Sequence, residues 1–289
     1  MCSSWSHTRL CCQAFFQRVI TTGMLSSTNK KKGDAEEPTA RLAVLIDADN
    51  AQAAVIDELF AEVARYGEAT VRRIYGDFTT QASSAWKKVL HRHAIRPMQQ
   101  FAYTTGKNAT DSALIIDAMD LVYTRRFDGF CLVTSDSDFT GLAVRLREEG
   151  LVVLGFGEKK TPEAFRTACH KFTFTEVLRA SSTALASVQP SPGPASAVEP
   201  SPPATPAQAP LEIPVAFLMQ ALDQSADDSG WAHLGTFGSY LTKLQPEFDS
   251  RLYGFKKLSD LVMAKTELFV TEERQPPGSA HKVMYLRAR

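Results

Sequence analysis

The chain has 289 residues, and its 32 lysine and arginine residues balance 32 aspartate and glutamate residues, so the formal net charge is zero. A hydrophobic share of 44% is typical of a folded globular protein. The neutral balance excludes an overall basic field as evidence for nucleic-acid binding, and the cysteine spacing excludes a zinc site.

The first 40 residues contain no acidic residue before Asp34, and we expect them to be a disordered or misassigned N-terminal extension. If the start is misassigned, we expect Met24 to be the true initiator. A weak transit peptide is the alternative. The sequence holds no apolar run of the ~20 residues that a membrane helix needs. We therefore expect no membrane partner and a cytoplasmic location, with buried reduced thiols at Cys131 and Cys169.

Residues 41–180 alternate short apolar runs with segments of helical periodicity, which predicts an α/β domain with a mostly parallel sheet and helices on both faces. Pro97 places one strand at an edge, Thr110 is an expected N-cap and Gly150 ends a helix. The expected strands are 41–47, 70–75, 95–101, 130–134 and 151–156. The expected helices are 51–65, 83–93, 111–125, 139–149 and a final one that opens at Pro162.

Residues 181–210 are dominated by proline, alanine and serine, which predicts a partly extended linker. The following block, 211–289, has a different pattern, with three short helices and then a β-hairpin. This order is that of a small winged-helix (α+β) domain. The expected helices are 214–223, 234–244 and 258–265, and the expected strands are 268–271 and 283–286.

Four carboxylates fall at the carboxyl edge of the predicted sheet, where open parallel sheets bind ligands. Asp47 ends the first strand, and Asp136 and Asp138 follow the strand 130–134. Asp111 begins the helix after the 95–101 strand. Crowded carboxylates repel one another, and oxygen ligands suit Mg²⁺ or Mn²⁺. We expect all four to be metal ligands and catalytic residues, because such a cation can activate water for phosphodiester cleavage.

Other residues of these loops are candidates for substrate contacts. Asn50 can hold a metal-bound water or a phosphate oxygen, and Lys107 can neutralise a phosphate. Ser135 and Ser137 can orient the carboxylates. Each residue also has a simpler interpretation: Asp136 or Asp138 can cap the helix near Phe139, and Lys107 can be a solvated lysine. Asp117 and Asp120 are expected on the polar face of their helix.

Three stretches resemble the signature motifs of NYN domains, the LabA-like branch of the PIN-like nuclease superfamily. They are Leu45-Ile-Asp-Ala-Asp-Asn50, Thr110-Asp-Ser-Ala-Leu-Ile-Ile-Asp117 and Val133-Thr-Ser-Asp-Ser-Asp-Phe139. The resemblance covers about 41–180 and implies a Rossmannoid fold with metal-dependent RNA cleavage. It assigns the acidic positions to the four carboxylates above, with Asn50 alongside. The family often has glycine at position 135, where this chain has serine.

The block 211–289 resembles the OST-HTH, or LOTUS, domain, a winged-helix family implicated in RNA binding and sometimes in protein contacts. The motifs are Gly230-Trp-Ala-His-Leu-Gly, Lys243-Leu-Gln-Pro-Glu-Phe-Asp249 and Tyr253-Gly-Phe-Lys-Lys-Leu-Ser-Asp-Leu261. Lys256 and Lys257 start the third expected helix and are candidate phosphate contacts, with ordinary surface lysines as the alternative. Because this block has no broad basic face, a protein partner competes with RNA.

The leading hypothesis is a metal-dependent endoribonuclease with a tethered RNA-recognition domain, acting by attack of metal-activated water. A catalytically inactive adaptor that binds RNA or protein is the second hypothesis. A phosphatase or nucleotide hydrolase is the third, although the chain has no Gly-x-x-x-x-Gly-Lys-Ser/Thr loop.

Overall fold

The computed structural model describes residues 39–79, 84–101, 109–179, 213–275 and 282–289. The predicted N-terminal extension up to residue 38, the candidate Lys107 and the predicted linker 181–210 lie outside the described residues. No helix in the described part of the chain is long and apolar enough to cross a membrane.

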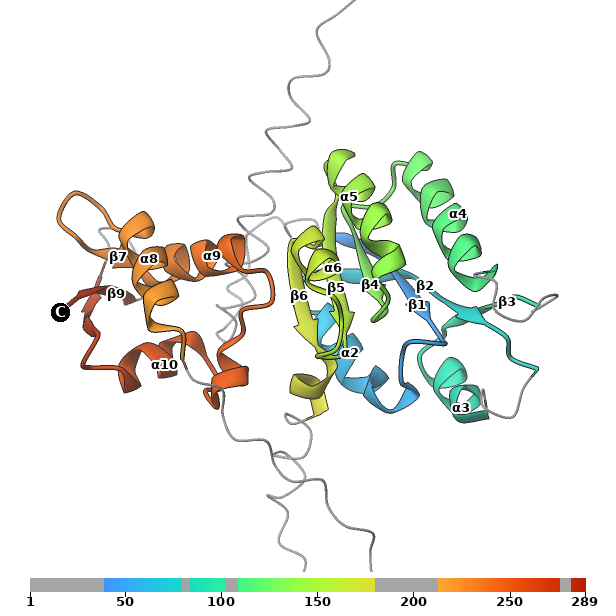
Figure 1. Ribbon diagram of the computed structural model, residues 1–289, viewed down its shortest axis with the longest axis horizontal. Coiled ribbons are helices and arrows are strands. Elements are labelled where there is room, and N and C mark those ends of the chain that lie inside the picture. Colours follow the sequence, from blue (N-terminus) through green and yellow to red (C-terminus); the bar gives the residue numbers. More distant parts are fainter. Residues whose placement is uncertain (1–38, 80–83, 102–108, 180–212, 276–281) are drawn as a thin grey trace, which may run out of the picture.

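The N-terminal domain is built on a six-stranded sheet in the order β3-β2-β1-β4-β5-β6. Every pair of neighbouring strands is parallel. The strands are β1 Arg41–Asp47, β2 Glu68–Gly76, β3 Arg96–Gln99, β4 Gly129–Val133, β5 Val152–Gly157 and β6 Lys171–Phe174. The predicted parallel α/β fold is therefore confirmed, and β1 lies in the middle of the sheet (Figure 1).

Helices cover both faces of this sheet because β1 is apolar on both sides. Ala43 and Leu45 pack into one core cluster with α4, α5 and α6, whereas Val44 and Ile46 pack into the other with α2 and α3. The helical elements are η1 Ala53–Val55, α2 Ile56–Val63, α3 Ser84–Arg92, α4 Ala109–Tyr123, η3 Ser137–Phe139, α5 Thr140–Glu148 and α6 Glu163–Ala168. The period-two alternation of a strand thus fixes which helices share a face.

Two details of the predicted elements are wrong. Helix α4 begins at Ala109, so Thr110 lies in its first turn and is not the residue that precedes the helix. The helix that opens at Pro162 is not the last element of the domain, because β6 follows it and extends the sheet at its edge. The four residues of β6 are too few to give a clear strand signal in the sequence.

Other local expectations are confirmed. Pro97 lies in the edge strand β3, where its missing N–H disturbs one pairing only. Gly150 follows α5 with a φ of 79°, the left-handed conformation that ends helices. The thiols of Cys131 and Cys169 are buried and unpaired, and burial raises the pKa of both.

The C-terminal domain combines three helices with a small antiparallel sheet in the order β7-β9-β8. Its elements are α8 Val215–Ser225, β7 Ala232–His233, α9 Leu234–Leu244, η4 Ser250–Tyr253, α10 Leu258–Ala264, β8 Phe269–Arg274 and β9 Val283–Ala288. Its own core includes Leu218, Phe237, Leu261 and Leu286. Three helices followed by a hairpin confirm the predicted pattern, to which the structure adds β7 and η4.

Candidate active site

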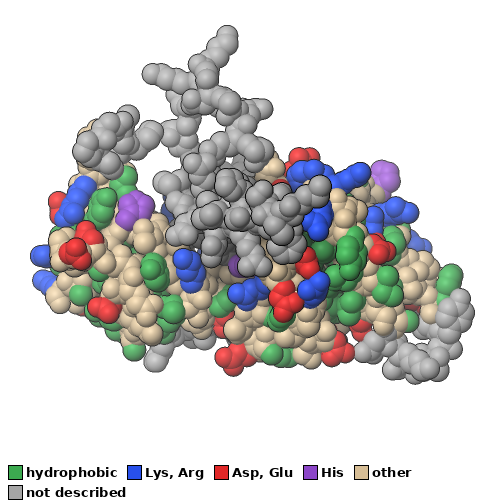
Figure 2. All heavy atoms as spheres, turned by 90° about the horizontal axis from the view of Figure 1, so that it is seen from above, with side chains coloured by type: hydrophobic (Ala, Val, Ile, Leu, Met, Phe, Trp, Pro, Cys, Tyr) green, Lys and Arg blue, Asp and Glu red, His purple; other side chains and the backbone are tan. Residues whose placement is uncertain are grey.

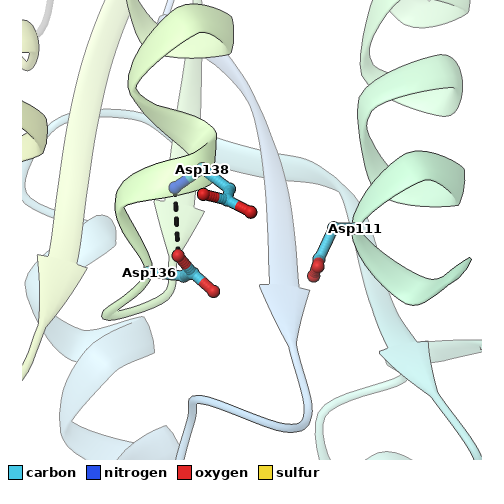
Figure 3. Close-up of side chains that lie close together, drawn as sticks. All are labelled: Asp111, Asp136 and Asp138. Atoms are coloured by element: carbon cyan, nitrogen blue, oxygen red, sulfur yellow. Dashed lines mark hydrogen bonds between the residues drawn. The ribbon is translucent and has the colours of Figure 1, made fainter. Parts of the chain in front are cut away.

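Three of the four predicted carboxylates lie together at the carboxyl edge of the sheet. Asp111 comes from the first turn of α4, while Asp136 and Asp138 come from the segment that follows β4. One oxygen of each carboxylate lies within 4.8 Å of the others. Figure 3 shows the side chains facing one another from two sides of the end of β1. Residues far apart in the sequence thus form one acidic cluster, which we call the Asp111 cluster.

The segment between β4 and α5 is held by its own hydrogen bonds. Oδ1 of Asp136 accepts a bond from the backbone N–H of Asp138 at 3.0 Å and caps the short helix η3 (Figure 3). The hydroxyl of Ser137 lies 3.5 Å from the same oxygen. The capping interpretation of Asp136 is therefore correct, and it coexists with a place in the cluster, because capping uses only one carboxylate oxygen.

Burial and the charges of neighbouring carboxylates act together on Asp111. Partial burial, together with the negative charges of Asp47, Asp136 and Asp138, raises the pKa of Asp111 to about 6. Burial and the charge of Asp47 also raise the pKa of the neighbouring Asp49. A bound cation would offset these effects and stabilise the charged form of the carboxylates.

Asp47 occupies a different position from the other three carboxylates. Its side chain is fully buried and is not one of the three whose oxygens lie within 4.8 Å of one another. Oδ2 accepts bonds from the Asn50 amide at 2.9 Å and from the Thr134 hydroxyl at 2.8 Å, and Oδ1 accepts from the N–H of Asp49. The structure therefore places Asn50 as a hydrogen-bond donor to the buried carboxylate of Asp47.

The predicted role of Ser135 in orienting carboxylates has no support in its hydrogen bonds. Ser135 is buried, and its hydroxyl oxygen accepts a bond from the backbone N–H of Glu158 at 2.9 Å. This contact ties the segment after β4 to the segment after β5. Ser135 thus shapes the sheet edge near Asp136.

The oxygen-only donor set fits a divalent cation. The carboxylates of the Asp111 cluster supply hard oxygen ligands, and no histidine or cysteine of the described residues belongs to the group. Burial and the negative charges of the nearby carboxylates both raise the pKa of Asp111, and a bound cation would offset both effects. Which divalent ion fits best depends on ligands that water or a substrate would add.

The candidate phosphate contacts of the C-terminal domain lie on its surface. Lys256 and Lys257 are exposed, and Lys257 is the N-cap residue of α10. A second basic feature, which the sequence did not suggest, lies on the hairpin. The guanidinium groups of Arg274 and Arg287 lie 4.4 and 4.9 Å from the ring centre of Trp231.

Comparison with known proteins assigns both domains. Residues 41–178 match the family model of the NYN domain, and residues 208–280 match that of the OST-HTH/LOTUS domain. The chain is an NYN domain protein with a C-terminal OST-HTH/LOTUS domain. This pair of domains supports a ribonuclease with an RNA-binding domain.

Two solved structures are similar to this NYN and OST-HTH protein. An uncharacterised protein of Nitrosomonas europaea is 58% identical, with 34% of this chain and 92% of that chain covered and a TM-score of 0.28. A protein of unknown function from Vibrio parahaemolyticus is 15% identical, with 49% and 96% covered and a TM-score of 0.41. No curated protein matches the chain.

Sequence reasoning missed Thr134 of the NYN domain. Its side chain is 1% exposed, and its hydroxyl donates to Asp47 while accepting the N–H of Asp136 at 3.1 Å. The available signal was its place between the apolar strand β4 and the acidic Ser135-Asp-Ser-Asp138 run. A buried hydroxyl group needs hydrogen-bond partners, and the end of the neighbouring strand β1 supplies one of them, the carboxylate of Asp47.

Asp117 of the NYN domain was predicted on the polar face of α4, and this prediction is wrong. Its side chain is only 16% exposed and forms an ion pair with Arg73 and a hydrogen bond with the hydroxyl of Tyr75. Both partners lie on β2, so the ion pair fixes α4 to the sheet less than two turns after Asp111. The helical pattern could not reveal this, because the partner arginine lies on a strand.

Proposed function

We propose that this protein is a metal-dependent endoribonuclease whose OST-HTH/LOTUS domain recruits RNA. The observation that carries the proposal is the Asp111 cluster, with three carboxylates at the carboxyl edge of the parallel sheet of an NYN domain. Such edges are where α/β sheets bind ligands, and a group of carboxylates there suits a cation and a phosphodiester.

The residues have distinct roles in this proposal. Asp111, Asp136 and Asp138 hold the cation, Mg²⁺ or Mn²⁺, which supplies charge stabilisation at the scissile phosphate. Asp47 contributes negative charge that acts on Asp111, and its bonds to Asn50 and Thr134 keep its carboxylate fixed. Hydrogen bonding through a second layer is the usual way in which ligands of a metal are oriented.

No net positive charge favours RNA binding, so RNA recruitment by the C-terminal domain depends on local groups of basic residues. On the face seen in Figure 2, lysine and arginine side chains are interspersed with aspartate and glutamate. We therefore assign phosphate contacts to small sets of residues, first Lys256 and Lys257. Arg274 and Arg287 beside Trp231 combine cations with an aromatic ring, a pairing that suits nucleic-acid bases.

The decisive experiment measures cleavage of single-stranded and structured RNAs with Mg²⁺ or Mn²⁺ and with a chelator. Asp136→Asn keeps a side-chain oxygen that can cap η3 but removes the charge, so the fold is retained while cleavage falls at least ~100-fold. Asp120→Asn, exposed on α4, is the matched control and keeps wild-type activity. Full cleavage by the Asp136 variant overturns the proposal.

The same assay separates the alternatives. Metal binding without cleavage of any RNA indicates an adaptor that holds RNA or protein. Release of phosphate from small phosphoesters, with RNA left intact, indicates a phosphatase, a reaction that acidic metal sites also support.

A further inference from the structure

The NYN and OST-HTH domains contact each other along the β6 edge of the parallel sheet. Figure 1 shows β6 as the strand of the sheet nearest to the C-terminal domain. Arg251 of η4 donates two hydrogen bonds to the carboxylate of Glu62 on α2, at 3.1 and 3.2 Å. These residues are 189 positions apart in the sequence. The contact therefore joins two domains that have separate sheets and cores.

The charges at this contact are removed from water. The side chain of Glu62 is 5% exposed and that of Arg251 is 19% exposed. Arg251 also pairs with Asp249 of its own domain at 2.6 Å, and Glu62 also pairs with Arg65 of its own helix. A buried charge is tolerated where hydrogen bonds and opposite charges surround it, and each of these side chains has a partner in both domains. Arg251→Glu therefore places two like charges in contact at a site with little access to water.

Three further contacts surround this pair. The backbone N–H of Phe172, on the outer edge of β6, donates to the carbonyl of Pro246 at 3.0 Å. Arg166 of α6 pairs with Glu247 at 2.9 Å. Leu252 of η4 packs against the core cluster of the NYN domain that lies under α4, α5 and α6. The interface thus combines a capped strand edge, two ion pairs and an apolar contact.

Lys171 strengthens this interpretation of the interface. Burial lowers the pKa of Lys171, while Asp249 of the other domain and Glu62 act in the opposite direction. Burial alone would raise the pKa of Asp249, but the hydrogen bonds from Arg251 and then the charge of Lys171 hold it below its usual value. Acidic and basic groups of the two domains therefore alternate across the contact.

We propose that the OST-HTH domain docks on the β6 edge as a fixed partner of the NYN domain, with Glu62 and Arg251 as its central pair. A strand edge with open hydrogen-bonding groups favours pairing with other chains, and Pro246 satisfies one of those groups from within the molecule. Docking holds the recognition domain in one orientation relative to the Asp111 cluster. The length of the 181–210 segment therefore does not determine the distance between that domain and the cluster.

This arrangement has a consequence for the reaction, and that consequence rests on the proposed function. A fixed orientation makes cleavage fall at a set number of nucleotides from the element that the OST-HTH domain binds. A domain that moves freely on a linker spreads cleavage over many positions, because its reach grows with linker length.

Docking is tested first without any activity measurement. Amide hydrogen exchange of Phe172 and small-angle scattering are recorded for the full chain, for Arg251→Glu and for Arg251→Lys. Arg251→Glu is expected to speed exchange at Phe172 by about tenfold or more and to increase the radius of gyration, whereas Arg251→Lys keeps the positive charge opposite Glu62 and changes both less. Lys265→Glu, which changes an exposed pair of the same domain, leaves both unchanged.

Arg251 also binds Asp249, so the Arg251 variants can unfold η4 locally. A second variant distinguishes this effect from loss of docking. Glu247→Arg opposes Arg166 and leaves Arg251 intact, so it tests the same interface from another side. Faster exchange at Phe172, with unchanged exchange inside α9, supports docking. Exchange in the wild-type chain as fast as in both variants overturns it.

Replacing 181–210 by a glycine and serine segment of twice the length completes the test. Docked domains keep the wild-type exchange rate at Phe172 and, where RNA is cleaved, the same cleavage positions. Exchange at Phe172 that becomes faster with the longer segment overturns docking. Because hydrogen exchange needs no cleavage, an inactive enzyme leaves this result intact and counts only against the proposed function.

Discussion

The hydroxyl of Thr134 donates a hydrogen bond to Oδ2 of Asp47 at 2.8 Å, and its oxygen accepts the backbone N–H of Asp136 at 3.1 Å. One buried side chain therefore connects the end of β1 with the segment that carries the acidic cluster. Because both Thr134 and Asp47 are almost completely buried, a lost bond has no simple replacement by water. The geometry of the site depends on this pair.

Thr134→Val tests the connection, because valine has nearly the same shape and lacks the hydroxyl. The variant leaves the buried Asp47 carboxylate short of one donor, which is expected to lower the free energy of unfolding by ~1–3 kcal/mol. Chemical denaturation measures this value, and Thr134→Ser keeps the hydroxyl and serves as control. A valine variant as stable as the serine variant contradicts the assigned role.

Asp111 gives a prediction for the metal-free protein that depends on pH. Its pKa in the folded state is about 6, above the usual aspartate value of 3.8, so the folded state binds the proton more tightly than the unfolded state. Stability therefore falls as the pH rises from about 4 through 6. Asp111→Asn removes this effect and is expected to be more stable than wild type at pH 7.5, on the order of 1 kcal/mol after allowance for solvent screening.

Urea denaturation with a chelator, at pH 4 and at pH 7.5, measures that difference, which disappears at the lower pH. Addition of Mg²⁺ or Mn²⁺ at pH 7.5 raises the stability of wild type but not that of the asparagine variant, since only wild type retains all ligands of the cluster. An asparagine variant that is less stable than wild type in chelator contradicts the repulsion within the cluster.

The sequence was sufficient for the parallel sheet and for the position of the acidic edge, and the reasons are physical. The apolar run 41–47 is buried on both faces, and parallel strands all end at one edge, which brings Asp136 and Asp138 towards Asp111. The difference between Asp47 and the other carboxylates could not be predicted. It depends on two donors, Asn50 and Thr134, whose side-chain directions only the folded chain defines.

Contacts between distant segments could also not be predicted from the sequence. Asp117 shows an ordinary helical spacing, and only the packing of α4 on β2 brings Arg73 to it. The same holds for Glu62 and Arg251, which belong to different domains. Periodicity describes which face of an element is buried, but it does not identify the residue opposite a buried charge.

Asp117→Asn tests whether the ion pair with Arg73 positions α4 and, with it, Asp111. Asparagine is nearly isosteric but leaves the half-buried Arg73 without its counter-charge, so the free energy of unfolding is expected to fall by ~1–3 kcal/mol. Because Asp111 lies on the same helix, Mn²⁺ affinity is expected to weaken as well. Isothermal titration with Mn²⁺ measures this effect. Asp120→Asn, exposed on α4, is the control, and equal behaviour of the two variants contradicts the positioning role.

Lys256 and Lys257 give a prediction for RNA binding that is independent of catalysis. Each phosphate contact releases counterions, so loss of two contacts reduces the dependence of log affinity on log salt by roughly 1.4 for a single strand. The double variant Lys256→Ala with Lys257→Ala is therefore expected to bind RNA more weakly at low salt and with a smaller salt slope.

Lys265→Ala, which removes a partly exposed lysine paired with Glu267, is the control and retains the wild-type slope. If the double variant keeps that slope while Arg287→Ala loses affinity, RNA contacts the hairpin beside Trp231 and not the start of α10.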